Sequence, residues 1–156
     1  MGVVGVSVLK NKRCESKAEF VNTANSIYDE TLAFLTRLSA RYARLLAQNI
    51  INLATEIADH CEKGNSIFPS DNVRKELRER HFLEARASLM ALDVHLTRVY
   101  GILIQNPQGA FTTASGNVIH SNDAVKRLDN MAQSLGEKID NLNRMLTELL
   151  KSDKRR

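Results

Sequence analysis

The last third of the chain carries an unbroken apolar repeat with alternating steps of three and four residues. Its members are Val125, Leu128, Ala132, Leu135, Ile139, Leu142, Leu146 and Leu149. A seven-residue period kept this strictly is typical of a helix that packs nearly parallel or antiparallel to its neighbours, at roughly 20°. Ser121 or Asn122 is the expected N-cap of this helix. The repeat therefore predicts a bundle of helices.

Three more amphipathic patterns precede this repeat. The first is expected over about 17–39, behind a capping box in which Ser16 and Glu19 satisfy each other's backbone amides. The second starts near Arg41 and should stop at Gly64. The third is expected from a cap at Ser70 or Asp71 to about Ile104, because Asn106 and Pro107 cannot continue it. Its predicted apolar stripe is Val73, Leu77, His81, Ala85, Leu89, Leu92, Leu96, Val99 and Leu103.

These patterns predict an all-α protein, an up-down four-helix bundle in one domain of 156 residues. Aromatic residues make up 5% of the chain and tryptophan is absent, which favours helices packed on helices over sheets. We expect an N-terminal arm over 1–15, the bundle over 16–151 and a solvated basic tail over 152–156. The long connection 105–121 is expected to be a loop, with a small hairpin as the alternative, and is either functional or mobile.

The compartment is predicted from the cysteines and from the first nine residues. Cys14 and Cys61 suggest no disulfide framework, which favours a reducing compartment. The opening MGVVGVSVL is too short to span a bilayer, which takes ~20 residues, and it lacks the basic start of a signal peptide. We therefore expect a soluble cytoplasmic protein with no membrane partner. The apolar arm either adds to a neighbouring chain or stays mobile.

No catalytic or cofactor motif is evident. A di-iron bundle needs two Glu-x-x-His pairs, whereas this chain has only His81 followed by Glu84, in the reverse order. The adjacent His60 and Cys61 point about 100° apart on a helix, so they do not make a base and nucleophile pair. No phosphate loop, dinucleotide motif or C-x-x-C is present. We expect no enzyme activity, no metal and no cofactor; the one enzymatic alternative is a reaction at a buried His81.

The distribution of arginine is the most informative chemical feature. Between Thr31 and Thr55 the chain contains Arg37, Arg41 and Arg44 but no acidic residue, and their spacing places them on one helix face. The third helix adds a second basic group, Arg74, Arg78 and Arg80, which is interleaved with glutamates. Arginine binds phosphate bidentately, so the covering partner is either nucleic acid or an acidic protein face. The alternative for the second group is an exposed face of intrahelical ion pairs.

Four short motifs recur here in an order known from one family. They are E-F-V-x-T-A at 19–24, R-Y at 41–42, N-S-I-F-P at 65–69 and R-H-F-x-E-A at 80–85. Over about 17–103 the chain resembles the accessory variability determinants, four-helix-bundle proteins encoded beside the reverse transcriptases of diversity-generating retroelements.

The resemblance implies a non-catalytic protein that binds the reverse transcriptase and nucleic acid, either template RNA or cDNA, and supports mutagenic reverse transcription. It also implies a homo-oligomer, a pentamer with basic surfaces, and assigns binding to Arg41, Arg74, Arg78 and Arg80. The alternative is a structural bundle that assembles with protein partners without binding nucleic acid. Extra apolar positions such as Ile51, Ile102 and Ile104 suggest that some surface serves another subunit.

Overall fold

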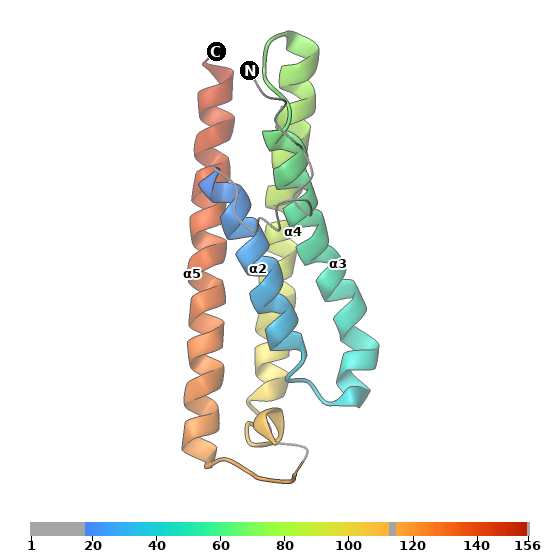
Figure 1. Cartoon of the computed structure of the whole chain (residues 1–156), viewed down its shortest axis with the longest axis vertical. Helices are drawn as coiled ribbons and strands as arrows, with labels where there is room; N and C mark the ends of the chain where they lie inside the picture. The colour runs from blue at the N-terminus through green and yellow to red at the C-terminus, as the bar shows by residue number, and fades with distance from the viewer. Residues whose placement is uncertain (1–17, 113–114, 156) are drawn as a thin grey trace, which may run out of the picture.

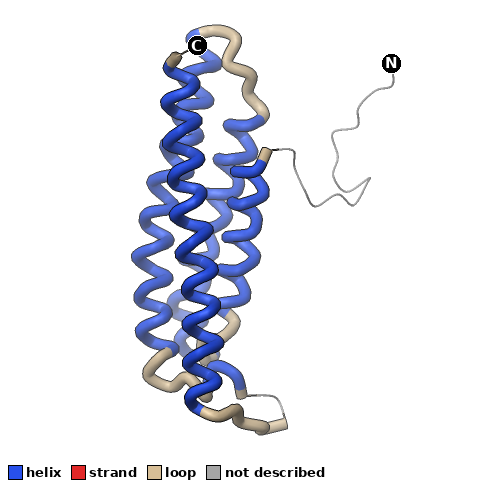
Figure 2. Tube along the Cα trace, turned by 90° about the vertical axis from the view of Figure 1, so that its left-hand side faces the viewer, coloured by secondary structure: helices blue, strands red, loops and turns tan. Residues whose placement is uncertain are grey.

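The computed structural model describes residues 18–112 and 115–155, and in these ranges it confirms the all-α, four-helix architecture. The helices are α2 (Glu19–Leu35), α3 (Ala40–Asn65), α4 (Asn72–Leu103) and α5 (Ser121–Lys154). Figure 2 shows helices joined by loops, with no strand in the described ranges. The expected N-terminal arm and the capping serine Ser16 lie outside the described residues.

Each helix packs against two others. α2 contacts α3 and α5, and α4 contacts the same two helices on the other side of the core. The helices alternate in direction, so α2 ends and α3 begins at the lower end of Figure 1, where α4 also ends and α5 begins. α2 has 17 residues and α5 has 34, which correspond to about 25 Å and 51 Å of helix. α2 therefore covers only part of the length of α5.

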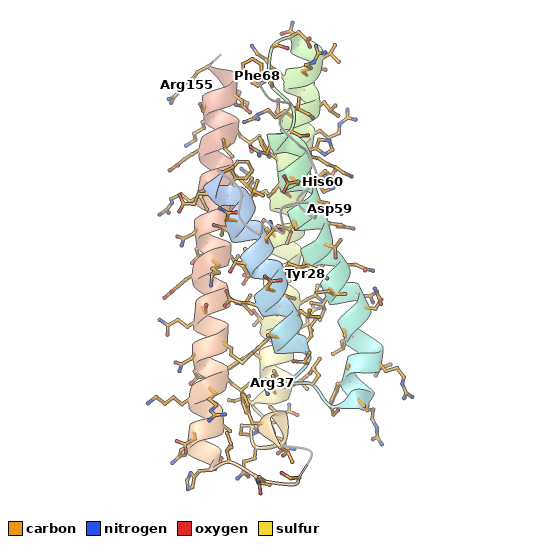
Figure 3. All side chains as sticks on the ribbon, in the orientation of Figure 1. Tyr28, Arg37, Asp59, His60, Phe68 and Arg155 are labelled. Carbon is orange, nitrogen blue, oxygen red and sulfur yellow. The ribbon has the colours of Figure 1, made fainter. Side chains whose placement is uncertain are left out.

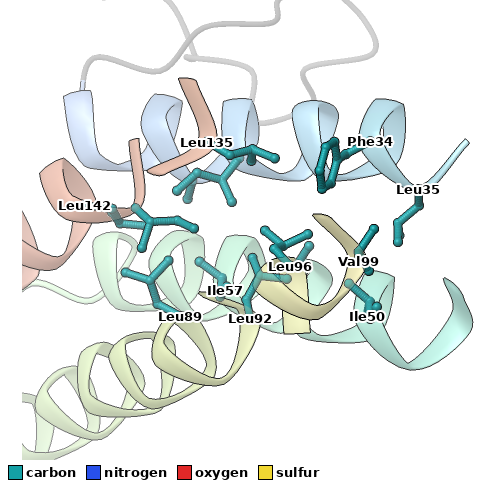
Figure 4. Close-up of a cluster of buried hydrophobic side chains, with 14 of the residues drawn as sticks. Phe34, Leu35, Ile50, Ile57, Leu89, Leu92, Leu96, Val99, Leu135 and Leu142 are labelled. Carbon is teal, nitrogen blue, oxygen red and sulfur yellow. The ribbon is translucent and has the colours of Figure 1, made fainter. Parts of the chain in front are cut away.

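The core forms along the facing stripes of all four helices (Figure 4). Ile57 of α3 and Leu89 and Leu92 of α4 are completely buried. The strict repeat of the last helix supplies much of the fourth side: its buried members are Leu128, Leu135, Ile139, Leu142 and Leu146. Burying one such side chain contributes about 1.5–3 kcal/mol, so this core is the main source of stability. The predicted helix and the middle of its buried face are confirmed, whereas at the two ends Ala124 and Leu150 are buried and Val125 and Leu149 are only half-buried.

Several helix ends differ from the sequence prediction. α2 ends at Leu35 rather than near 39, so Arg37 lies in the turn that follows the helix. The hydroxyl of Ser39 then caps α3 by accepting the amide of Tyr42 at 3.4 Å. Asp71 caps α4, as one of the two predicted candidates. The N-cap of α5 is His120, whose Nδ1 accepts from the amide of Asn122 at 3.3 Å, and not Ser121 or Asn122.

The first three turns of α4 are rotated by one residue from the predicted stripe. Val73 is 76% exposed and Leu77 44% exposed, although both were expected in the core. Arg78 and Phe82 are buried instead. The Phe82 ring packs edge-on against Phe20 of α2, with the ring centroids 5.5 Å apart. A buried aromatic ring removes more apolar surface from water than a valine, which favours this rotation.

Gly64 has a different role from the one predicted. α3 continues past it to Asn65, so this glycine does not end the helix. A Cβ atom at this position would lie 2.4 Å from Cε1 of Phe82. The sequence needs glycine here because the aromatic ring of α4 packs directly on the α3 backbone.

The connection between α4 and α5 is a compact turn. Its described residues contain the 3₁₀ helix η1 (Gly109–Phe111), and the small hairpin considered as an alternative is not found among them. Ala110 and Phe111 are buried against the end of the bundle. At the other terminus α5 runs through Lys154, beyond the boundary expected at 151. Asp153 is buried, so the predicted tail contributes to the bundle.

Candidate nucleic-acid interface

The six predicted binding arginines lie in two groups at opposite ends of the bundle. Arg37, Arg41 and Arg44 belong to the turn after α2 and the start of α3. Arg74, Arg78 and Arg80 lie in the first turns of α4, which begins beside the end of α3 (Figure 1). The α3 helix separates the two groups by about 36 Å along its axis. The structure therefore does not join the six into one surface.

Arg41 and Arg44 lie on the outer face of α3, and both are exposed. Within the described ranges neither forms an ion pair. One and two turns further along the same face are Gln48 and Asn52, whose side chains are joined by a hydrogen bond of 2.9 Å from Nε2 to Oδ1. We call these four residues the α3 basic face. It carries two unpaired guanidinium groups and no carboxylate.

The start of α3 exposes apolar side chains as well. Leu45 is 70% exposed and Tyr42 is 42% exposed, although both belong to the apolar pattern of the helix. Burial in α3 begins only at Ile50. In Figure 1 the start of α3 diverges from α2, which leaves these first turns without a covering helix. Tyr42 does not join the α3 basic face, because it lies about 100° from Arg41 around the helix and lines a pocket together with Arg37.

Arg37 lies at a pocket of about 150 Å³ at the lower end of the bundle (Figure 3). Its guanidinium carbon lies 4.6 Å from the centroid of the Phe111 ring, and its Nη1 donates to the carbonyl of Ala110 at 3.5 Å. Arg127 of α5 lies over the same ring at 5.6 Å. In the described structure the Nε atom of Arg37 is buried without a hydrogen-bond partner. Arg37 therefore anchors the η1 turn and does not continue the α3 basic face.

Arg78 is buried, and this position differs from the predicted binding role. Its Nε donates to Oδ2 of Asp153 at 2.6 Å, and its Nη1 donates to the carbonyls of Gly64 and Ile67 at 3.2 and 3.1 Å. The guanidinium also lies 4.8 Å from the centroid of the Phe82 ring. Arg78 thus donates to the carbonyls at the end of α3 and joins that end to α5, so its Nε and Nη1 donors are not available to a ligand.

Arg74 and Arg80 remain at the surface. The guanidinium of Arg74 pairs with Asp71, and the Arg74 amide donates to the same carboxylate at 2.8 Å. The Arg74 amide and guanidinium lower the pKa of Asp71. Arg80 is exposed and forms no ion pair with any described residue. Of the second group, only Arg80 presents an uncommitted charge.

Sequence reasoning missed three residues near the first group. Gln48 and Asn52 could have been found, because they continue the face of Arg41 and Arg44 at helical spacing. Arg127 carried no signal in the sequence, because its place over the Phe111 ring depends on the η1 turn. Amide side chains next to arginines add donors and acceptors that reach base edges.

No alternative catalytic centre emerges from the described residues. They contain no group of three or more histidine, cysteine, aspartate or glutamate side chains placed to hold a metal ion. Cys61 is a buried free cysteine, and burial raises its pKa to about 12. A thiol with that pKa is protonated at neutral pH and is a poor nucleophile. His81 is half-buried, not enclosed in the core as the enzymatic alternative required.

No protein-family model, curated protein or solved structure matches this chain. The resemblance to the accessory variability determinants therefore depends on the four short motifs alone. A membrane-spanning helix would need a longer apolar run than any helix in the described ranges contains.

Proposed function

We propose that this chain is a non-catalytic accessory protein of a diversity-generating retroelement. It binds the reverse transcriptase together with template RNA or cDNA, and it supports mutagenic copying in the cytoplasm. The family resemblance supports the choice of reverse transcriptase as partner and of a pentamer as the assembly. The α3 basic face is the single structural observation on which nucleic-acid binding rests.

The α3 basic face favours nucleic acid for an electrostatic reason. Arg41 and Arg44 are exposed, and no described carboxylate competes for their guanidinium groups. The chain contains no acidic residue from Thr31 to Thr55, so nothing in this stretch opposes a phosphate backbone. Arginine binds phosphate in a bidentate fashion. Template RNA or cDNA, as the family resemblance implies, is the ligand that we assign to this face.

A second surface supports self-assembly. The outer face of α4, opposite the core, carries an exposed stripe of Leu83, Ala87, Met90 and Val94 in steps of four, three and four residues. Leu83, Met90 and Val94 are 43%, 44% and 51% exposed. Apolar side chains at this spacing form the seam between two helices when a partner is present. We assign this stripe to contact with a second copy of the chain.

The stripe also supports the alternative function, a bundle that assembles with proteins and does not bind nucleic acid. The two proposals share the α4 contact and differ only in the role of the α3 basic face. Loss of RNA binding on charge reversal at that face supports the accessory protein, whereas stable self-association without RNA binding supports the alternative.

The test is a titration of fluorescently labelled single-stranded RNA at several salt concentrations. The informative variant is Arg41→Glu with Arg44→Glu. The control is Arg144→Glu with Lys151→Glu, two exposed positions on α5. Both variants change the formal charge from +4 to zero, so net charge is matched. We expect the first variant to lower affinity at least tenfold and to reduce the salt slope by about 1.4, since each lost contact to a single strand is worth about 0.7.

Equal binding by the wild type and the Arg41, Arg44 variant would refute the proposed role of the α3 basic face. Equal loss in both variants would indicate a nonspecific response to net charge. A third variant, Arg80→Glu, examines the remaining uncommitted arginine at the other end of the bundle, where we expect no more than a twofold effect on RNA binding.

A further inference from the structure

His60 and His81 meet at the contact between α3 and α4. Their Nδ1 atoms are 3.0 Å apart, and their rings are tilted by 37° with centroids separated by 5.2 Å. Both side chains are half-buried, so the pair lies at the edge of the helix contact (His60 is labelled in Figure 3). One imidazole donates its Nδ1 hydrogen and the other accepts with its Nδ1 lone pair. The packing of α3 on α4 thus brings together two ring nitrogens from residues that are far apart in the sequence.

This nitrogen separation matches that of two neighbouring ligands on one metal ion. Metal–imidazole bonds of about 2.05 Å place two cis nitrogens about 2.9 Å apart at 90° and about 3.3 Å apart at the tetrahedral angle. The observed 3.0 Å is closer to the right-angled arrangement. Square-planar and octahedral coordination by nitrogen is typical of Cu²⁺ and Ni²⁺. When the donor ring carries its hydrogen on Nε2 instead of Nδ1, both Nδ1 lone pairs are free for one such ion.

We propose that His60 and His81 form a two-histidine site for a divalent cation of the copper or nickel type, with water in the remaining positions. The site joins α3 to α4 and is independent of the proposed nucleic-acid binding.

The surroundings of the two histidines determine the affinity of the site for metal and its selectivity among metals. Burial, followed by the charges of His60, Lys63 and Arg80, lowers the pKa of His81, and a neutral imidazole is the form that binds a metal. The nearby side chains of Lys63 and Arg80 are positively charged and oppose the binding of a metal cation. No third side-chain ligand is placed here among the described residues. A site of this kind is weak and exchangeable, and it rejects Mg²⁺, which prefers oxygen ligands.

The test is calorimetric titration of the untagged full chain with NiCl₂ at neutral pH in a buffer that does not chelate metals. The variants His60→Gln and His81→Gln each remove one ligand. The matched control, His95→Gln with His120→Gln, removes the other two histidines. We expect one Ni²⁺ per chain in the wild type and in the control, a loss of affinity of at least tenfold in either single variant, and no competition from excess MgCl₂.

A second readout separates ligation from folding. Ni²⁺ should raise the thermal midpoint of the wild type and the control but not that of His60→Gln or His81→Gln, while all four proteins keep the same far-UV circular dichroism without metal. Equal Ni²⁺ affinity in the wild type and both single variants would overturn the proposal, and so would loss of binding in the control. Because Arg41 and Arg44 are not involved, failure here leaves the RNA-binding test unaffected.

Discussion

The buried pair of Arg78 and Asp153 makes a strong prediction about stability. The two side chains are only 10% and 9% exposed, and their contact joins α4 to α5. Oδ1 of Asp153 already lacks a hydrogen-bond partner among the described residues. The change Arg78→Ala would leave the whole carboxylate buried and unpaired, and it would remove a donor from the carbonyl of Ile67. Breaking a buried pair from one side costs about 3–5 kcal/mol.

We therefore expect Arg78→Ala to lower the free energy of unfolding by about 3–5 kcal/mol, measured by urea denaturation with far-UV circular dichroism. The control is Arg80→Ala, two residues further along α4. Arg80 is exposed and unpaired with described residues, so its loss should change stability by no more than about 0.5 kcal/mol. Replacing both partners by apolar residues, Arg78→Met with Asp153→Leu, should recover most of the loss because no charge remains buried.

A loss below about 1 kcal/mol for Arg78→Ala would refute this reasoning. Full additivity between Arg78→Ala and Asp153→Ala would refute it equally, because partners in contact must show a coupling energy. If Arg78→Ala and Arg80→Ala have the same free energy of unfolding, Arg78 is exposed in solution and can contact a ligand.

Three further predictions concern a glycine, a thiol and a carboxylate. Gly64→Ala should cost about 1–3 kcal/mol in urea denaturation, because its Cβ would overlap an aromatic ring, whereas Gly136→Ala, with open space around the added methyl, should stabilise by about 0.5–1 kcal/mol. Cys61 should resist iodoacetamide in the folded protein and react at once in urea, because burial raises its pKa to about 12; rapid alkylation of a folded Cys14→Ser variant would contradict its burial. Burial raises the pKa of Glu30, but hydrogen bonds from Lys138 and Ser134 outweigh burial and lower this pKa below 4.5. The stabilisation by Glu30 is therefore present above pH 4.5 and is lost as the pH falls through the folded-state pKa. Glu30→Gln should flatten the acid side of the stability curve, and an unchanged curve would exclude this linkage.

The sequence was sufficient where one apolar period extended over a whole helix. The repeat of α5 predicted the helix and the middle of its buried face, since a bundle satisfies such a pattern. The sequence was not sufficient where two faces of one helix compete for burial in the core. In α4 the apolar residues Val73 and Leu77 suggested one face, whereas Phe82 packs on Gly64 and rotates the buried face by one residue. A single sequence carries no information about which contact from another helix will decide such a case.

The candidate site was predictable only in part, for a similar reason. Arg41 and Arg44 share an exposed helix face, and their helical spacing was enough to group them. Arg78 follows the same basic pattern but is buried by Asp153, a residue at the far end of the chain. Arg37 is separated from its neighbours because α2 ends early and Phe111 binds its guanidinium. Charge patterns locate arginines along a helix, but tertiary partners decide which of them remain free.

The most direct test of the proposed function is size-exclusion chromatography with light scattering at low and high salt, recording the ratio of nucleic-acid to protein absorbance. The proposal predicts an oligomer of pentamer size that carries nucleic acid at low salt and releases it at high salt, since phosphate contacts by arginine are salt-sensitive. A monomer free of nucleic acid at both salt concentrations would contradict the proposal and leave the four-helix bundle as the supported conclusion.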